Sequence, residues 1–124
     1  MAAKNPEDVE RLFEERVNAG DLEGVLALYE PGATLVRPEG DVTGAAAVRA
    51  FWSQTLAAKP RLQTQVTKVV RVGDDLAVLY NEWSGSMRGP DGQVTALAGK
   101  ATEVVRRQAD GTWRFIVDDP RMRG

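Results

Sequence analysis

The residues best suited to chemistry are carboxyls in the last quarter of the chain. Glu103 lies within residues 98–105, where most of its neighbours are small or apolar. If Glu103 faces a pocket, the loss of hydration raises its pKa, and such a carboxyl can act as an acid or a base near neutral pH. The alternatives are a solvated, outward-facing glutamate and one paired with Arg106 or Arg114. We predict that Glu103 is an acid-base group.

Two adjacent aspartates, Asp118 and Asp119, end the last predicted strand. Because side chains alternate along a strand, only one of them can share a face with Glu103. A two-residue loop at Asp110-Gly111 places Asp118 directly opposite Glu103, whereas a three-residue loop over residues 109–111 places Asp119 on that face. We predict Asp118. Two carboxyls so close repel each other, so one should keep its proton, and the pair gains separate acid and base roles.

Arg37 is the third candidate, because a guanidinium can neutralise Glu103 and Asp118 or bind a carboxylate or enolate oxygen of a ligand. The alternative for Arg37 is a surface position in a turn. If the carboxyls prevail, one proton remains at neutral pH; if Arg37 prevails, both carboxyls are ionised and form a structural ion-pair cluster. A strand-end aspartate could also be neutralised by Arg121 or Arg123.

Large aromatic side chains are candidates to line a ligand cavity. We predict four of them as ligand-binding residues: Phe13, Tyr29, Trp52 and Trp83. Asn81 lies two residues from Trp83 in a predicted strand, so it shares that face and offers both a donor and an acceptor. The alternative is that these aromatic residues only fill the core, which is our prediction for Trp113.

Composition excludes several classes of function. The 124 residues include no cysteine and no histidine, which removes Ser-His-Asp, Cys-His and histidine-metal catalysis. With 18 acidic and 16 basic residues the net charge is −2, so a nucleic-acid partner is not expected. No phosphate-binding glycine motif or loop of spaced oxygen ligands occurs, and we therefore predict no cofactor and no metal.

The length and the ends of the sequence give expectations about organisation. A chain of 124 residues predicts one domain spanning residues 1–124. Its first ten residues lack the charged and then apolar layout of a signal peptide, and no apolar run reaches 18 residues. We therefore expect a cytoplasmic protein with no membrane partner.

The first half of the chain is predicted to form three amphipathic helices. Asn5-Pro6 followed by two acidic residues is typical of a helix start. The helices are expected to begin near Pro6, Asp21 and Gly44, and to end at Asn18-Ala19-Gly20, Glu30-Pro31-Gly32 and Lys59-Pro60. Tyr29 belongs to the apolar side of the second helix in this prediction, and one short strand is expected at residues 33–36.

From residue 62 onward the pattern favours strands, because β-branched residues are frequent and turn signals bound each run. The predicted strands cover residues 65–72, 76–87, 94–107 and 112–119. Their short connections make neighbours in sequence antiparallel neighbours in space. The sequence thus predicts an α+β fold in which a curved antiparallel sheet is covered by three helices from the N-terminal half, with a cavity between the layers.

Several short motifs occur in an order and spacing typical of one superfamily. They are Asn18-Ala19-Gly20-Asp21, Leu28-Tyr29 before Ala33-Thr34, Gly44 before residues 47–52, and residues 110–114. Through these motifs nearly the whole chain resembles the nuclear transport factor 2-like superfamily, with its SnoaL-like and ketosteroid isomerase-like branches. Thr102-Glu103-Val104, residues 110–113 and Asp118-Asp119-Pro120 are similar to the ending of a large bacterial subgroup.

The resemblance implies a cystatin-like fold with a cone-shaped hydrophobic pocket and a homodimer formed across the sheet. On this basis we expect Val78, Tyr80, Val104 and Phe115 to face outward, toward a second copy. The resemblance does not specify the reaction, because the superfamily includes isomerases, cyclases, epoxide hydrolases, dehydratases and proteins without activity.

Ketosteroid isomerases resemble this chain in scaffold more than in catalytic residues. By position, their catalytic aspartate falls on Arg37, their oxyanion tyrosine on Phe13 and their oxyanion aspartic acid on Glu103. A cation cannot abstract a proton and phenylalanine has no hydroxyl, so only the third position keeps its function. Tyr29 and Trp52 match aromatic pocket positions. Steroid isomerisation by the usual triad is therefore not expected.

These observations lead to one hypothesis and two alternatives. The hypothesis is a small-molecule pocket protein that performs cofactor-free acid-base catalysis, of isomerase or cyclase type, on an apolar oxygenated ligand through Glu103 and Asp118. The first alternative is a non-catalytic module that binds a hydrophobic ligand or dimerises, with the carboxyls neutralised by Arg37. The second is an epoxide hydrolase-like or dehydratase-like enzyme, of which the epoxide hydrolase type needs an ordered water.

Overall fold

The computed structural model describes residues 2–121 and contains three helices in the N-terminal half. The helices are α1 (Pro6–Asn18), α2 (Leu22–Leu26) and α3 (Ala45–Ala57). As predicted, α1 begins at Pro6, where Asp8 accepts the backbone N–H of Asn5 at 3.2 Å. Asp21 begins α2 by accepting the N–H of Gly24 at 3.0 Å, which supplies a partner for a free donor of the first turn.

The remaining elements form one six-stranded sheet. The strands are β1 (Tyr29–Leu35), β2 (Val42–Thr43), β3 (Arg61–Val72), β4 (Leu76–Arg88), β5 (Val94–Arg107) and β6 (Trp113–Asp119). Their order across the sheet is β2-β1-β6-β5-β4-β3. All neighbours are antiparallel except β1 and β6, which are parallel. The predicted α+β class is confirmed, and β2 and the parallel pair are additions to it.

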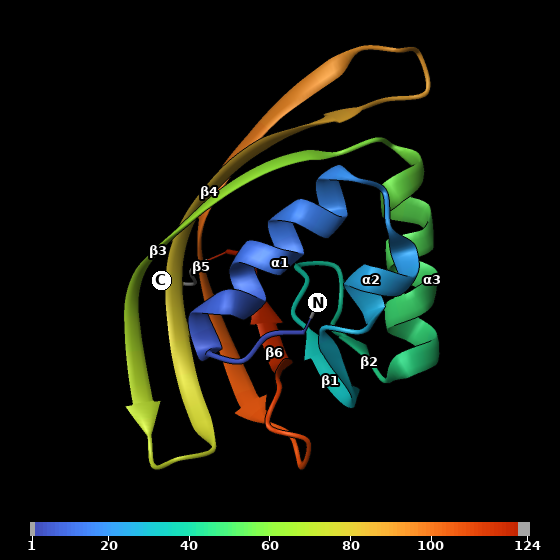
Figure 1. The fold of residues 1–124 in the computed structure, drawn as a ribbon. Coiled ribbons are helices and arrows are strands. Elements are labelled where there is room, and N and C mark those ends of the chain that lie inside the picture. Colours follow the sequence, from blue (N-terminus) through green and yellow to red (C-terminus); the bar gives the residue numbers. More distant parts are fainter. Residues whose placement is uncertain (1, 122–124) are drawn as a thin grey trace.

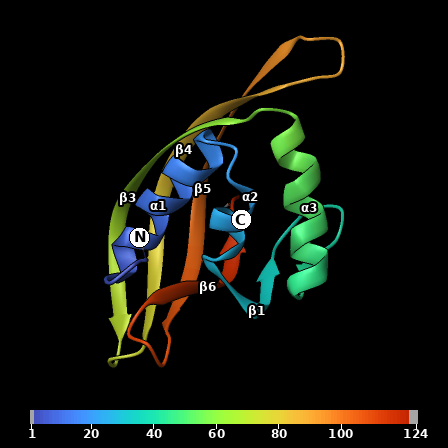
Figure 2. The same ribbon diagram turned by 45° about the vertical axis from the view of Figure 1, so that its right-hand side comes forward.

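The sheet is curved and the helices lie on its concave side. Figures 1 and 2 show β3, β4 and β5 bending around α1, while α3 stands opposite the sheet with α2 beside it. Beyond the helices, the far ends of β4 and β5 project as a long hairpin (Figure 1). The core fills the space between the layers, with α1, β1, β4, β5 and β6 supplying its most buried side chains. Within residues 2–121 no helix is long and apolar enough to cross a membrane.

The second helix is shorter than predicted. It ends at Leu26, and Tyr29 begins β1, where it pairs with Phe115 of β6. Pro31 and Gly32 follow within β1, at a point where the pairing with β6 is irregular. An irregular register tolerates a residue that has no N–H for the ladder. The prediction that Tyr29 is helical was wrong because pairing with the sheet outweighs the helical spacing of the apolar residues.

The hairpin between β5 and β6 has a three-residue loop at residues 109–111, rather than the predicted two-residue loop. Gly111 takes a φ of 85°, the left-handed conformation that such loops usually place on glycine. In this register Phe115 lies opposite Val105 instead of Arg106 and is 1% exposed in the core. The predicted outward position of Phe115 is therefore wrong.

A β-bulge then changes the register within β6. Phe115 and Val117 lie opposite consecutive residues of β5, so Ile116 between them has no partner of its own. The extra residue reverses the alternation of side chains. Asp118 consequently lies directly opposite Glu103, on the core-facing side of the sheet.

Candidate functional site

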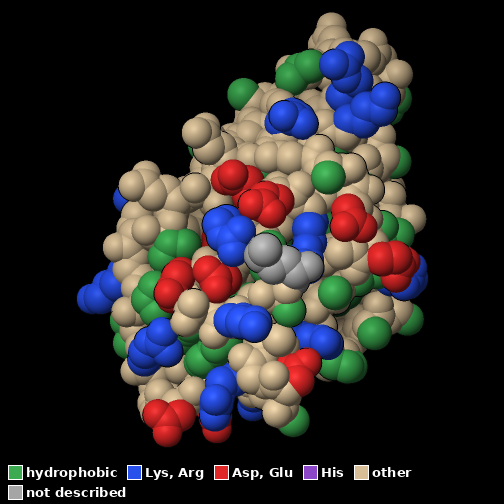
Figure 3. Space-filling model, in the orientation of Figure 1, with side chains coloured by type: hydrophobic (Ala, Val, Ile, Leu, Met, Phe, Trp, Pro, Cys, Tyr) green, Lys and Arg blue, Asp and Glu red, His purple; other side chains and the backbone are tan. Residues whose placement is uncertain are grey.

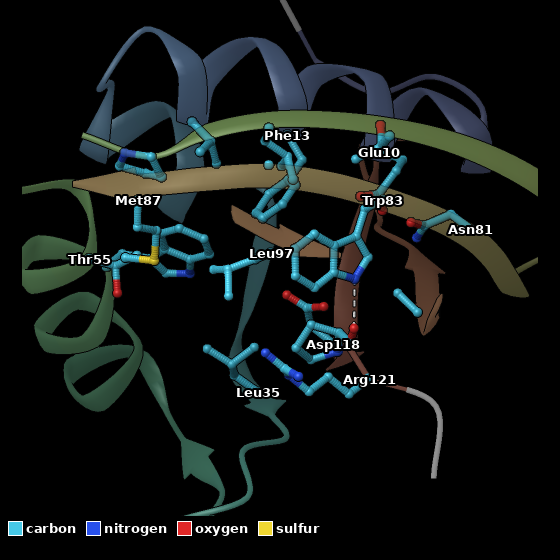
Figure 4. A pocket seen from close by; sticks show the side chains of 18 of the residues that line it. Glu10, Phe13, Leu35, Thr55, Asn81, Trp83, Met87, Leu97, Asp118 and Arg121 are labelled. Atoms are coloured by element: carbon cyan, nitrogen blue, oxygen red, sulfur yellow. Dashed lines mark hydrogen bonds between the residues drawn. The ribbon is translucent and has the colours of Figure 1, made fainter. Parts of the chain in front are cut away.

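A cavity of about 220 Å³ lies between the concave face of the sheet and the helices. Most of its wall is apolar and includes Phe13, Leu35, Trp52, Trp83, Met87 and Leu97. Figure 4 labels all of these side chains except Trp52 and shows them around the cavity, with Asp118 below the Trp83 ring. The Trp83 indole N–H donates to the carbonyl oxygen of Pro120 at 2.7 Å, which holds the end of the described chain against the wall.

Three buried carboxyls line this cavity. Glu103 of β5 is 1% exposed, Asp118 of β6 is 6% exposed and Glu10 of α1 is 4% exposed. The cross-strand pairing brings the first two together, and α1 supplies the third from above the sheet. Three carboxyls removed from water and placed near one another cannot all be ionised at little cost.

Glu103 is the member of this cluster most strongly biased toward its neutral form. Burial raises its pKa well above the usual range, and the charge of Glu10 and a hydrogen bond with Glu10 raise it further. The amide Nδ2 of Asn81 donates to Glu103 Oε1, which only partly opposes these effects. The neutral form of Glu103 is therefore favoured, and its carboxylic acid proton can be donated in a hydrogen bond.

Glu10 was not predicted from the sequence. Burial raises its pKa to about 7, the hydrogen bond with Glu103 opposes the rise and the charge of Asp118 adds to it. The signal for Glu10 was present, because Glu10, Phe13 and Val17 recur at helical spacing and so share the apolar face of α1. An acidic residue on such a face is expected to be buried.

Asp118 is the member of the cluster that is mostly ionised at pH 7. Burial raises its pKa to about 6, and a hydrogen bond from the Tyr29 hydroxyl opposes the rise. That hydroxyl donates to Asp118 Oδ2 at 2.6 Å and accepts from the indole N–H of Trp52 at 3.2 Å. Tyr29 does not line the cavity but lies behind Asp118, where it orients the carboxylate.

Three buried polar atoms of the site have no hydrogen-bond partner among the described residues. They are Glu10 Oε2, Glu103 Oε2 and Asn81 Oδ1. A proton kept on Glu103 and donated to Glu10 accounts for the bond between these two side chains. The Asn81 oxygen remains an acceptor with no donor, and buried acceptors in proteins normally have one. This oxygen is therefore free to accept a hydrogen bond from a group outside the described residues.

Arg37 lines the cavity but does not neutralise the carboxyls. Its Nε pairs with Glu39 at 3.2 Å, and its guanidinium lies over the ring of Phe51 at 5.1 Å. Within residues 2–121 it forms no ion pair with Glu103 or Asp118; its charge only lowers the pKa of Asp118 slightly against the larger effect of burial. The arrangement in which Arg37 prevails over the carboxyls is therefore not observed.

The other predicted residues fall into two groups, those that line the cavity and those that do not. Phe13, Trp52, Asn81 and Trp83 line the cavity together with the carboxyls. Asp119 does not: it lies opposite Thr102 of β5, and its carboxylate accepts the backbone N–H of Arg121 at 3.2 Å. Trp113 is buried in the core as predicted. Arg123 lies outside the described residues, and within them no group of three or more carboxylates is placed to hold a metal ion.

Comparison with known proteins identifies the family. The family model of the SnoaL-like domain matches residues 9–116, which is most of the chain. The chain belongs to the SnoaL-like domain family. This result agrees with the resemblance to the nuclear transport factor 2-like superfamily found in the sequence motifs. No curated protein matches this SnoaL-like domain.

Solved structures share its fold. A ketosteroid isomerase-like protein from Erwinia carotovora atroseptica is 19% identical, with a TM-score of 0.82 over 91% of this chain and 89% of that chain. A candidate calcium/calmodulin-dependent protein kinase type II association domain from Thiobacillus denitrificans is 25% identical, with a TM-score of 0.77 over 98% and 99%. A candidate dehydratase of the NTF2-like family from Streptomyces avermitilis is 21% identical, with a TM-score of 0.74 over 94% of both chains.

Proposed function

We propose that this SnoaL-like domain binds a small apolar molecule with an oxygen function and catalyses proton transfer on it, in a cofactor-free reaction of isomerase or cyclase type. The observation that carries the proposal is the convergence of three buried carboxyls in one aromatic-walled cavity. Their pKa values are raised unequally, so an acid and a base coexist at neutral pH. Such a pairing is what acid-base catalysis requires.

The roles follow from protonation and position. Protonated Glu103 donates a hydrogen bond to the carbonyl oxygen of the substrate. The Asp118 carboxylate removes a proton from the carbon next to that carbonyl, and the electron pair of the broken C–H bond moves to the oxygen. The developing negative charge is stabilised by the Glu103 proton in a site with little water. Asp118 then returns the proton to a different carbon in an isomerisation. In a cyclisation the enolate carbon instead attacks a second carbonyl carbon of the same molecule, the π electrons of that carbonyl move to its oxygen, and this oxygen takes the proton from Asp118.

Asp118 is better suited than Glu103 to be the base. A pKa of about 6 leaves it mostly ionised at pH 7 while keeping it a stronger base than an ordinary aspartate. The hydrogen bond from Tyr29 occupies Oδ2, so Oδ1 is the oxygen available for the substrate. Glu10, with a pKa of about 7, accepts the Glu103 proton while the cavity holds no substrate, and on binding that single proton is donated to the substrate oxygen instead.

The proposal predicts that the protein accelerates proton exchange in a small ketone. The probe is 2-tetralone, a bicyclic ketone, incubated in D₂O while proton NMR follows the loss of the signals next to the carbonyl. The protein should exceed buffer at equal pH, and Asp118→Asn should lower its rate by about 10²- to 10⁴-fold. The matched control is Asp119→Asn, which removes a neighbouring carboxylate outside the cavity and should keep most of the rate. If the protein binds 2-tetralone without accelerating exchange, the non-catalytic alternative is correct.

We further propose that a second copy of the chain covers the outer face of the sheet. Val70, Val78, Val104 and Val117 are direct partners across four strands and form an apolar row on that face. Tyr80, in the next row, is 39% exposed. The name of the Thiobacillus structure, an association domain, supports assembly through this fold.

Light scattering during size exclusion at micromolar concentration tests this association. The expected mass is twice the chain mass of 13.5 kDa. Val104→Lys should give a monomer, because a charge in the centre of the apolar row opposes its burial. Ser53→Lys, on the exposed side of α3, adds the same charge elsewhere and should remain dimeric. A monomeric unmodified protein would contradict the proposal.

A further inference from the structure

We propose that the ligand of this cavity is an elongated organic anion, whose oxygen function lies at the buried carboxyls and whose charged end lies against Arg61. The inference rests on the ligand-binding part of the proposed function. It names the class of ligand, which neither the family nor the carboxyl cluster specifies.

The first observation is the position of Arg61. It is the first residue of β3, it is exposed, and it lines the same cavity as the carboxyls. Asn81, the donor to Glu103, and Ser86, the direct partner of Arg61, are five residues apart on β4. At about 3.4 Å per residue this separation is about 17 Å along the strand. An arginine side chain spans part of this distance, and the remainder suits a molecule of two or three rings.

The second observation is that Arg61 has no acidic partner. Its Nη1 donates to the backbone carbonyl of Asn18 at 3.3 Å, and no carboxylate within residues 2–121 lies within salt-bridge distance. Lys59 and Arg88 are close by, since the N–H of Arg88 donates to Ala58 O at 2.9 Å. Figure 3 shows a group of basic side chains over this end of the molecule, with no acidic side chain among them. Lys59, Arg61 and Arg88 outnumber Asp91, the acidic residue of the turn between β4 and β5, so this end has a net positive charge although the chain has a net charge of −2.

The third observation is that the other two arginines of the cavity are less suited to an anion. Arg37 is paired with Glu39 and lies over Phe51. Arg121 lies two residues after Asp119, whose carboxylate accepts its backbone N–H at 3.2 Å, so the neighbouring negative charges reduce its positive potential. Figure 4 shows Arg121 on the same side of the cavity as Asp118, with Met87 on the opposite side. Among the cavity arginines within residues 2–121, Arg61 is thus the one that has neither an acidic partner nor an acidic neighbour in the sequence.

The chemistry of the two ends then defines the ligand. A planar guanidinium binds a carboxylate or sulfonate through two parallel hydrogen bonds. The apolar wall suits an aromatic or alicyclic body, and protonated Glu103 suits a carbonyl, ether or hydroxyl oxygen at the far end. A carboxylate placed at the buried end instead would meet three carboxyls, so the ligand can enter in only one orientation.

The test compares two probes that differ only in charge. Naproxen, 2-(6-methoxynaphthalen-2-yl)propanoate, has a bicyclic body with an ether oxygen at one end and a carboxylate at the other; its primary amide is the neutral counterpart. Calorimetric titration at pH 7 and low salt should give a dissociation constant at least tenfold lower for the acid. Arg61→Gln should reduce this ratio about tenfold or more, the range expected for hydrogen bonds to a charged group. Arg88→Gln removes the same charge from a residue outside the cavity wall and should keep the ratio.

Each result decides the proposal. Equal affinities for acid and amide, or a ratio that Arg61→Gln leaves intact, would overturn it. A ratio that Arg88→Gln lowers as much as Arg61→Gln would also overturn it, because a general positive potential would then explain the preference. The proposed function is still supported after any of these failures if the unmodified protein accelerates proton exchange in 2-tetralone, which is a neutral ketone. Failure of both probes and of 2-tetralone to bind would overturn both proposals.

Discussion

Replacement of Glu103 by glutamine is expected to slow the exchange of 2-tetralone protons about 100-fold or more, while the protein stays folded. Glutamine keeps the shape of the side chain, and its Oε1 can still accept from Asn81 Nδ2. It cannot lend a carboxylic acid proton to the developing enolate, and the loss of one donor to an oxyanion typically costs about 10²- to 10³-fold in rate. The expected change is therefore in kcat, with KM for the ketone less affected.

Glu82→Gln is the matched control for Glu103→Gln. Glu82 lies on the outer face of β4, where it is exposed and its Oε1 lies 3.9 Å from Nζ of Lys100. Its replacement should leave the exchange rate unchanged. Circular dichroism and urea unfolding establish that both variants are folded. Full activity of a folded Glu103→Gln would show that this carboxyl is not the acid. Unfolding of the variant would mean that Glu103 is structural.

The free energy of unfolding is expected to fall as the pH rises from about 4 to about 7. Asp118 and Glu10 have folded-state pKa values of about 6 and about 7, above the values of about 3.9 and 4.3 for unfolded chains. The folded state therefore holds protons that the unfolded state releases. Their stabilising effect is complete below the unfolded pKa and is lost as the pH rises through the folded pKa. A two-unit shift corresponds to about 3 kcal/mol at most for one group.

Glu10→Gln isolates one part of this pH dependence. The variant has no carboxyl to ionise at that position, so its unfolding free energy should fall less between pH 4.5 and pH 7.5 than that of the unmodified protein. Glu15→Gln, on the exposed side of the same helix, should leave the slope unchanged. Urea unfolding at four pH values and constant protein concentration measures the slopes. A stability that rises over this range in the unmodified protein would contradict the assigned protonation states.

The fold was largely predictable because most elements have strong local signals. The boundaries of α1 and β5 agree with the predicted residues, and α3 and β4 differ by only one or two. The error at α2 arose where helical spacing and sheet pairing compete, since Tyr29 fits both patterns and its partner Phe115 is 86 residues away. Local spacing contains no information about a partner so distant.

The site was predictable in part. Glu103 and Asp118 were placed opposite each other, but the argument for Asp118 used the wrong loop, and the bulge at Ile116 compensated for that error. Bulges depend on packing between strands and have no reliable sequence signal. Glu10 was overlooked because α1 was considered only through its apolar residues, although its spacing to Phe13 indicated burial. The ion pair between Arg37 and Glu39 is local, two residues apart, and could have been expected.

Ile116, the residue of β6 that has no partner on β5, divides this short strand into two halves with different roles. Before Ile116 the inward-facing side chain is Phe115, which packs in the core, and after it the inward-facing side chain is Asp118, which lines the cavity. A substitution in one half can therefore leave the other half in place. If the same residues paired without the bulge, in the register set by Phe115 and Val105, Phe115 would stay in the core, but Val117 and Asp119 would turn inward and Asp118 would turn toward the outer face. A change of register alone, without any substitution, would thus exchange the proposed base for its neighbour. A relative that lacked only Ile116 would instead keep its aspartate opposite Glu103, so a gap at this column leaves the carboxylate in place.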